Sequence, residues 1–108
     1  MNKIASLKTS ATLIIAEGCD NHFGSLDNAK KMVLNAKRAG ADVIKFQHHI
    51  PDEEMLPIVP KSKNFKISLY NFLKKYSLKL KDHELLKKFC EKKKNKIFMY
   101  AIFIKSSL

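Results

Sequence analysis

Two short apolar runs on either side of one amphipathic segment constrain the fold of this 108-residue chain more than any other feature. Residues 11–16 and 43–46 are mostly apolar and of strand length, as expected of strands buried on both faces of a parallel sheet. Between them, apolar residues recur every three or four positions over residues 26–36, which predicts a helix with one buried stripe. Ser25 can cap this helix and Gly40 can end it. The order predicts a βαβ unit with a right-handed crossover, and therefore an α/β fold.

The second half of the chain continues the alternation of helices and strands. Three prolines break regular structure over residues 50–63 and predict a long loop, which in a small domain is usually a binding loop or a lid. Residues 69–76 form a short amphipathic pattern, a second helix is predicted with Asp82 as its cap, and residues 97–104 read as a third strand. Three parallel strands make half of a doubly wound fold or the first two to three βα units of a barrel.

The net charge of +11 comes entirely from the second half of the chain. Residues 1–60 hold seven Lys or Arg and seven Asp or Glu, whereas residues 61–108 hold fourteen lysines, three acidic residues and no arginine. Because nucleic-acid grooves favour arginine and stacking aromatics, we interpret the lysines as a solvated face and predict no nucleic-acid partner.

No segment of the sequence indicates a membrane protein. The longest apolar run, residues 97–104, is far shorter than the roughly 20 residues of a membrane-spanning helix. Lys3 and Lys8 precede an apolar patch, but Glu17 closes it and no cleavage site follows, so no signal peptide is predicted. Two cysteines without a disulfide-like spacing fit a reducing compartment. We therefore expect a cytoplasmic protein.

Polar side chains stand where the two predicted strands end. Alternation along the second strand places Lys45 and Gln47 on one face and Ile44 and Phe46 on the other. The carboxyl ends of parallel strands are where βα proteins build their sites, and a lysine there can bind phosphate or carboxylate. Glu17 ends the first run and can receive a substrate hydroxyl or orient the lysine. The alternatives are a lysine that reaches into water and an acid that only ends a strand.

Four histidines raise the question of a metal site: His22, His48, His49 and His83. The two adjacent ones would point to opposite faces of a strand, and no cysteine or carboxylate set completes a ligand count, so no metal site is predicted. We expect His83, in a first helical turn, at the surface. Asn21 and His22 can contact a ligand or only form the turn. The acidic residues 52–54 can bind a cation, although such runs are more often solvated loops.

Four motifs, in chain order, resemble the N-terminal part of the sialic acid synthase family, which makes N-acetylneuraminic, legionaminic and pseudaminic acids. They are Ile14-Ile15-Ala16-Glu17, Asn21-His22-Phe23-Gly24-Ser25-Leu26, Ala39-Gly40-Ala41-Asp42-Val43-Ile44-Lys45-Phe46-Gln47 and Ser68-Leu69-Tyr70. On this resemblance residues 9–95 are the N-terminal portion of a TIM (β/α)8 barrel, and residues 96–108 are a divergent tail.

The resemblance implies an enzyme that condenses phosphoenolpyruvate with N-acetylmannosamine or a related acetamido sugar. It implies Mn²⁺ or Mg²⁺ for the full-length family and no cofactor held by this chain alone. Matching positions assign Lys45 to phosphoenolpyruvate, Gln47 and Asn64 to the sugar, and Glu17 as the active-site acid. Asn21 and His22 are two further substrate-binding candidates.

The chain also departs from the family pattern. The family loop reads Glu-x-Gly-x-Asn-His, whereas Gly18 stands one position early. His48-His49 replaces a Thr followed by an aromatic residue or His, which leaves the sugar open. The family's metal-binding histidines lie beyond residue 108, so we expect an inactive N-terminal fragment. The alternative is a non-catalytic binding or assembly partner of a full-length synthase. As partners of the chain we consider a second copy in a homodimer or the missing half of the barrel supplied in trans.

The last thirteen residues suggest how the ending arose. Synonymous codons exist that, read one nucleotide later, turn residues 96–108 into a tail close to the family continuation. The lysine-rich residues 92–96 would be encoded by an adenine-rich tract, where slippage is easy. We therefore interpret residues from about 96 onward as frameshifted. Sequencing the locus tests this, because the interpretation is wrong if no barrel continuation lies in another frame.

Overall fold

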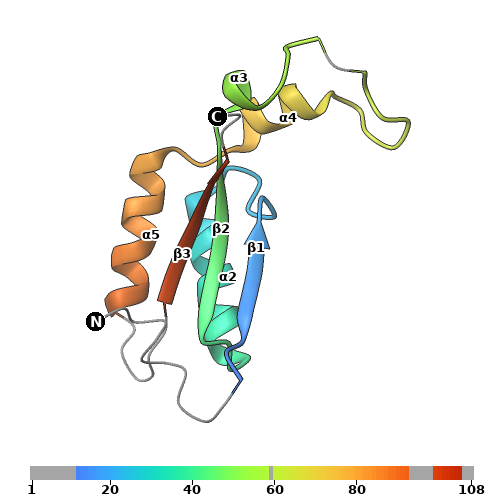
Figure 1. Ribbon diagram of the computed structural model, residues 1–108. Helices are drawn as coiled ribbons and strands as arrows, with labels where there is room; N and C mark the ends of the chain where they lie inside the picture. Colours follow the sequence, from blue (N-terminus) through green and yellow to red (C-terminus); the bar gives the residue numbers. More distant parts are fainter. Residues whose placement is uncertain (1–11, 59, 93–98, 106–108) are drawn as a thin grey trace.

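A computed structural model describes residues 12–58, 60–92 and 99–105 of the chain. Its elements, in order, are β1 (Ile15–Cys19), α2 (Leu26–Arg38), β2 (Val43–His49), α3 (Pro51–Glu54), α4 (Leu69–Tyr76), α5 (Leu80–Lys92) and β3 (Met99–Lys105). The three strands form one sheet in the order β1-β2-β3, and both pairs are parallel (Figure 1). The predicted α/β class and the parallel βαβ unit are confirmed.

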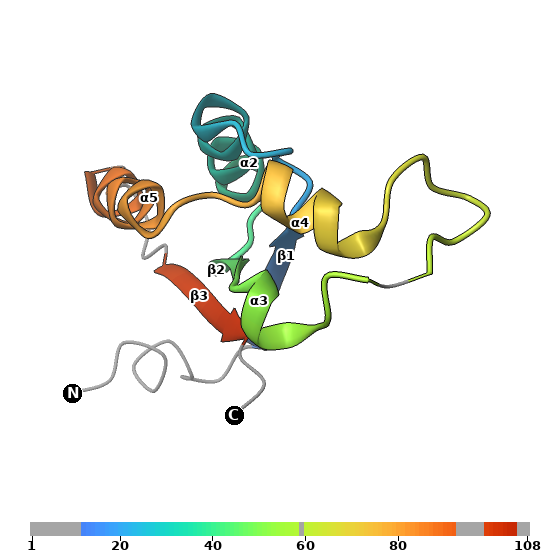
Figure 2. The ribbon, with the colours of Figure 1, turned by 90° about the horizontal axis from the view of Figure 1, so that it is seen from above.

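The long helices lie on one side of the sheet. Figure 2 shows α2 and α5 side by side over the same face, and Figure 1 shows α3 and α4 beyond the carboxyl ends of the strands. No helix among the described residues covers the opposite face. The sheet therefore has one packed face and one face that no described helix covers, which we call the open face.

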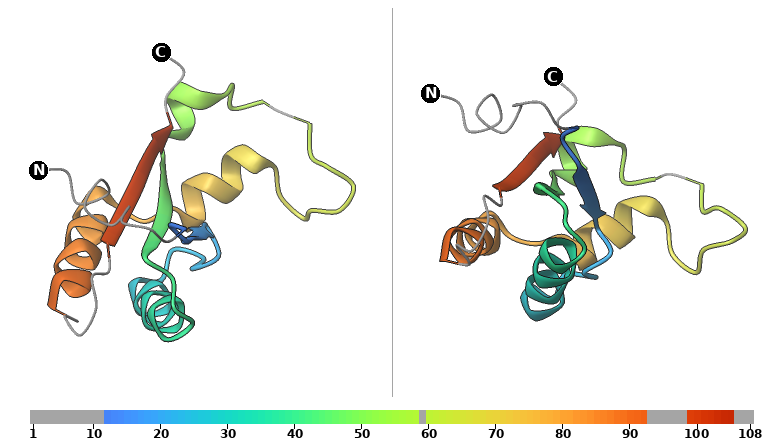
Figure 3. Two further views of the ribbon diagram at one scale, coloured as in Figure 1. Left: turned by 60° about the horizontal axis from the view of Figure 1, so that its bottom comes forward. Right: turned by 90° about the horizontal axis from the view of Figure 1, so that it is seen from below.

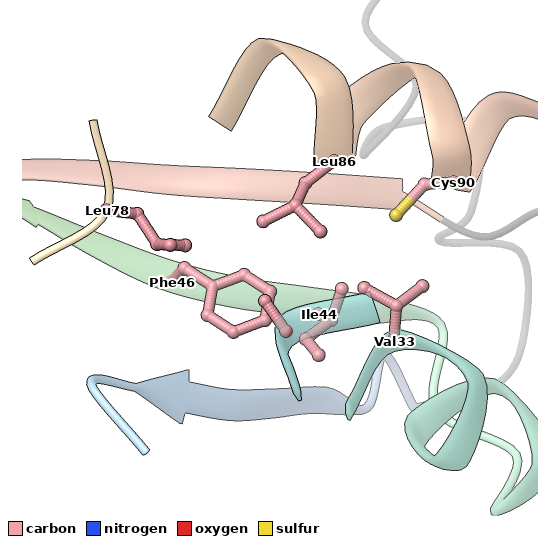
Figure 4. Close-up of a cluster of buried hydrophobic side chains, with 7 residues drawn as sticks. Val33, Ile44, Phe46, Leu78, Leu86 and Cys90 are labelled. Atoms are coloured by element: carbon pink, nitrogen blue, oxygen red, sulfur yellow. The ribbon is translucent and has the colours of Figure 1, made fainter. Parts of the chain in front are cut away.

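The packed face holds the core of the domain. Phe46 and Ile44 of β2 lie between the two long helices, and their side chains are almost fully buried. Figure 4 shows them in one cluster with Val33, Leu86, Cys90 and Leu78. A buried aliphatic or aromatic side chain contributes about 1.5–3 kcal/mol to folding, so this cluster is what holds α2 and α5 to the sheet.

Helix α2 is bounded by the residues that the sequence indicated. The Ser25 hydroxyl accepts a hydrogen bond from the Asn28 backbone N–H at 3.2 Å, as an N-cap does. At the other end Gly40 has a φ of 92°, a left-handed conformation that glycine adopts without strain. The short helix α4 is likewise confirmed, with Ser68 as its cap.

The first strand differs from the prediction. It begins at Ile15 and continues past Glu17 to Cys19, instead of spanning residues 11–16. It is also not buried on both faces, because Ile15 is 46% exposed. The reason is its position, since β1 is at an edge of the described sheet and only one of its faces has a helix over it.

Three further predictions need correction. Helix α3 forms inside the stretch predicted to be irregular, because Pro51 stands at its first turn, where no backbone N–H is needed. Helix α5 begins at Leu80, so Asp82 is not its cap; its carboxylate accepts from the Lys79 backbone N–H at 3.4 Å. His83, expected at the surface, is buried, because its ring stacks edge-on against His48 at 5.3 Å between centroids.

A long loop is present, but it lies between Glu54 at the end of α3 and Leu69 at the start of α4 instead of over residues 50–63, and it extends away from the sheet (Figure 3). Several apolar side chains are exposed along it, namely Leu56, Ile58 and Phe65.

Some predictions concern residues outside the described ranges. Residues 1–11, which bear on the signal-peptide question, and residues 93–98, where the frameshift would begin, are among them. The predicted third strand is observed as β3, which pairs with β2 over seven residue pairs. Within the described part of the chain, no helix is both long and apolar enough to cross a membrane.

Candidate functional site

Glu17 and Lys45 face each other across β1 and β2. They are direct partners in the parallel register, and the Lys45 ammonium lies 3.2 Å from a Glu17 carboxylate oxygen. Their side chains are 50% and 34% exposed, on the face of the sheet that no described helix covers. An exposed ion pair stabilises a fold by only about 0.2–1 kcal/mol, so stability alone is a weak reason for it.

A bulge in β1 follows this pair directly. The register with β2 shifts between Glu17 and Cys19, and the backbone of Cys19 has a φ of 51°. A Cβ atom on Gly18 would lie 2.6 Å from the Phe46 ring, so this position requires glycine for close packing. Close packing against Phe46 thus explains why a glycine stands at position 18. The left-handed backbone conformation is adopted by the next residue, Cys19.

His49 lies at the end of β2, on the same open face, and its ring contacts three side chains. Its Nδ1 is 2.9 and 3.1 Å from the two carboxylate oxygens of Glu54 in α3. Its Nε2 is 2.9 Å from Asp20 in the loop after β1 and 3.0 Å from the amide oxygen of Gln47. We call these four side chains, Asp20, Gln47, His49 and Glu54, the His49 cluster. It ties the loop after β1 to β2 and α3.

The cluster is anchored on the backbone and continues into α4. A Glu54 oxygen also accepts the Ile50 backbone N–H at 2.7 Å, which holds α3 against the end of β2. From α3, Asp52 accepts a hydrogen bond from the Tyr70 hydroxyl of α4 and lies 3.6 Å from the Lys74 ammonium. The hydrogen bond from Tyr70, and secondarily the positive charge of Lys74, lowers the pKa of Asp52. Two of the acidic residues 52–54, Asp52 and Glu54, therefore connect neighbouring elements.

The remaining predicted site residues, His22, Asn21 and Asn64, are outside the Glu17–Lys45 pair and the His49 cluster. His22 is fully buried; its Nδ1 accepts from the Gly24 N–H at 2.9 Å and its ring lies 5.8 Å from that of Phe46. Asn21 is exposed in the same loop. Asn64 is exposed in the long loop between α3 and α4, which extends away from the sheet (Figure 1).

A second group of histidines lies on the helix-covered side. His83 contacts His48, and burial lowers its pKa to about 4, with further lowering by the nearby His48 and His22. Burial also lowers the pKa of His22, partly opposed by Asp20. His83 and His22 are therefore held as neutral imidazoles near neutral pH.

Sequence reasoning missed His49, Asp20 and Glu54 as a connected group. A signal for His49 was present, because the alternation that pairs Lys45 with Gln47 on one face includes residue 49 as the next member. Asp20 and Glu54 gave no such signal, since one is in a turn and the other follows a proline.

The divalent metal ion implied by the resemblance finds no donor set here. No group of three or more His, Cys, Asp or Glu side chains that could hold a metal ion occurs in the part of the chain that the structure describes. In the His49 cluster each imidazole nitrogen already faces a carboxylate oxygen. We therefore assign no chemical step to a metal ion at this site.

Comparison with known proteins identifies relatives. A 79-residue region is 39% identical to the N,N'-diacetyllegionaminic acid synthase of Legionella pneumophila, covering 68% of this chain and 22% of that protein. A 39-residue region is 56% identical to the pseudaminic acid synthase of Campylobacter jejuni, covering 36% of this chain and 11% of that protein. An uncharacterised protein of Methanocaldococcus jannaschii is 35% identical over 85 residues, 79% of this chain and 23% of that protein.

The chain thus spans less than a quarter of the length of these curated relatives. The sequence profile of the NeuB family matches residues 32–107, which include β2, the helices that follow it and β3. Since this match covers more than half of the sequence, the chain belongs to the NeuB family.

Proposed function

We propose that this chain forms one wall of the substrate site of a sialic-acid-type synthase. The reaction is the condensation of phosphoenolpyruvate with N-acetylmannosamine or a related acetamido sugar to a nonulosonic acid. In this proposal the three-stranded sheet is the first part of a TIM barrel, with its open face toward the barrel interior. The names of the pseudaminic and legionaminic acid synthases among its relatives support the substrate class.

The observation that carries the proposal is the Glu17–Lys45 pair. It lies across neighbouring parallel strands, with Nζ and Oε1 3.2 Å apart, on the face of the sheet that is free of described helices. A lysine ammonium offers three donors and a full charge to a phosphate or carboxylate. Glu17 fixes the direction of that ammonium, and it can accept a substrate hydroxyl once the lysine has turned to the anion.

The length of the chain limits what it does alone. Because it spans less than a quarter of its curated relatives, most of a synthase site would come from sequence not present here. We propose that the 108 residues bind phosphoenolpyruvate weakly and do not turn it over unless the rest of a barrel is supplied. Phosphate release from phosphoenolpyruvate, with N-acetylmannosamine and Mn²⁺, measures turnover, and release by the purified chain would contradict this part of the proposal.

Binding is tested by titrating phosphoenolpyruvate into the ¹⁵N-labelled chain and following amide shifts. Lys45→Met should weaken binding about tenfold or more, because a hydrogen bond to a charged group is worth about 1.5–3 kcal/mol. Lys87→Met is the matched control, since Lys87 is an exposed lysine of α5, away from the open face. Equal binding by both variants would refute the assignment of Lys45.

A second function, assembly with a full-length synthase, is favoured by the exposed apolar side chains. Ile15 on β1 and Leu56, Ile58 and Phe65 in the long loop are each more than 45% exposed. Such residues are covered when a partner completes the sheet and its layers. Sedimentation of the chain with and without a purified family synthase tests this, and an unchanged sedimentation coefficient at micromolar concentrations would exclude it.

A further inference from the structure

The ring of His49 is surrounded by hydrogen-bond acceptors. Nδ1 faces both Glu54 oxygens, at 2.9 and 3.1 Å, and Nε2 faces an Asp20 oxygen at 2.9 Å and the Gln47 amide oxygen at 3.0 Å. The side chains of His49 and Glu54 are only 7% and 3% exposed, and that of Asp20 is 18% exposed. Water therefore screens the electrostatic interactions among these side chains only weakly.

When Glu54 and Asp20 are both ionised, only one form of the imidazole satisfies these contacts. A neutral ring donates from one nitrogen and presents a lone pair at the other, which would face a carboxylate at 2.9 Å. The doubly protonated ring donates from both nitrogens, and its charge lies between two carboxylates, where charge-assisted hydrogen bonds are strong. The geometry thus matches an imidazolium held on both sides.

The orientation of the Gln47 amide follows from this. Because Nε2–H is a donor, the group that it meets on Gln47 must be the carbonyl oxygen, at 3.0 Å. The amide NH₂ of Gln47 is then directed away from His49 and is left as a donor. Gln47 stands on β2 two residues after Lys45 and on the same face of the strand.

We propose that His49 is a positioning residue, a doubly protonated imidazole clamped by Asp20 and Glu54, which fixes Gln47 so that its amide NH₂ donates to an acceptor oxygen of the acetamido sugar. The sugar contact rests on the proposed function. The clamp does not, because it is defined by contacts within the chain.

The first experiment tests the clamp without any substrate. Nitrogen-15 NMR of the histidine rings at pH 7.5 should show both nitrogens of His49 protonated. In Glu54→Gln, which keeps the shape of the side chain and removes its charge, one ring nitrogen should lose its proton at the same pH. A wild-type His49 with one bare ring nitrogen would overturn the clamp.

The second experiment tests the effect on Gln47. In His49→Phe, which keeps a ring and removes both donors, the affinity for N-acetylmannosamine should fall about fivefold to tenfold, as expected for the loss of one oriented hydrogen bond. Binding of phosphoenolpyruvate should stay within twofold. His48→Phe is the matched control, since His48 is the adjacent residue and contacts His83 on the other face. If His49→Phe does not fold, Glu54→Gln takes its place, with a smaller loss expected.

The outcomes of these experiments distinguish a failure of the His49 proposal from a failure of the proposed function. Equal loss of sugar binding in the His48 and His49 variants, or equal loss of both ligands in the His49 variant, would overturn the positioning role. A wild-type chain that binds phosphoenolpyruvate but no sugar would overturn the Gln47 contact. A wild-type chain that binds neither ligand but shows the doubly protonated ring would overturn the proposed function and the sugar contact, and would leave the clamp standing.

Discussion

The two faces of β2 place neighbouring residues in opposite environments. On the helix-covered face Ile44 and Phe46 are buried among apolar side chains, and His48 lies against His83. On the open face Lys45 pairs with Glu17, and His49 lies between two carboxylates. His48 and His49 are adjacent in sequence, yet one belongs to a desolvated cluster and the other to a charged one. A shift of one position along a strand therefore decides whether a side chain serves packing or polar chemistry.

The largest effect on stability is expected from removing Phe46, a large buried side chain of the packed face. Phe46→Ala should lower the free energy of unfolding by about 3–5 kcal/mol, because it leaves a cavity between α2 and the sheet. Glu17→Gln, on the open face, should cost no more than about 1 kcal/mol. Urea unfolding followed by circular dichroism measures both, and similar losses in the two variants would show that the faces are not energetically distinct.

Acid should weaken the packed face through its histidines. His83 has a pKa of about 4 in the folded chain, below the ordinary value of 6.5, because it is buried and close to His48 and His22; Asp82 opposes this shift. The unfolded chain therefore binds a proton between pH 6.5 and 4 that the folded chain does not, and stability falls as the pH decreases through that window.

The expected loss from His83 is on the order of 2 kcal/mol between pH 6.5 and 4. Urea unfolding at several pH values measures it, with His83→Leu as the comparison. The variant should show a shallower dependence on pH than the wild type. Parallel curves for the two proteins would contradict the buried, neutral state of His83.

The smallest effect concerns the bulge beside the Glu17–Lys45 pair. Cys19 adopts a φ of 51°, which costs a side chain about 1–2 kcal/mol, whereas glycine adopts it freely but loses about 0.5–1 kcal/mol of chain entropy. Cys19→Gly should therefore raise the free energy of unfolding by up to about 1 kcal/mol. Cys19→Ser keeps the strain and should change little. A destabilised glycine variant would mean that the cysteine side chain makes contacts worth more than the strain.

The patterns of the sequence predicted those parts of the fold that depend on local periodicity. The stripe of α2, its Ser25 cap and the alternation of β2 all follow from residues close together in the chain, and all are confirmed. The prediction for β1 failed, because its burial depends on whether another layer covers it, and no local pattern contains that information. The position of His83 failed for the same reason, since its neighbour His48 comes from a different element.

Some residues of the candidate site could likewise be identified from the sequence, whereas the roles of others stay predictions. Lys45 and Glu17 were identified from residue type and position at strand ends, and the parallel register places them side by side. The roles given to Gln47, Asn64, Asn21 and His22 remain predictions, and of these four residues Gln47 lies in the His49 cluster.

What the sequence by itself determined is the βαβ order, the apolar face of β2 and the family, because each depends on residue types at fixed spacings. Only the tertiary structure decided that Asp20, His49 and Glu54 meet. Asp20 and His49 are 29 positions apart, and it is the parallel pairing of β1 with β2 that brings the loop after one strand to the end of the other. The physical reason is that hydrogen bonds between strands set which distant residues become neighbours.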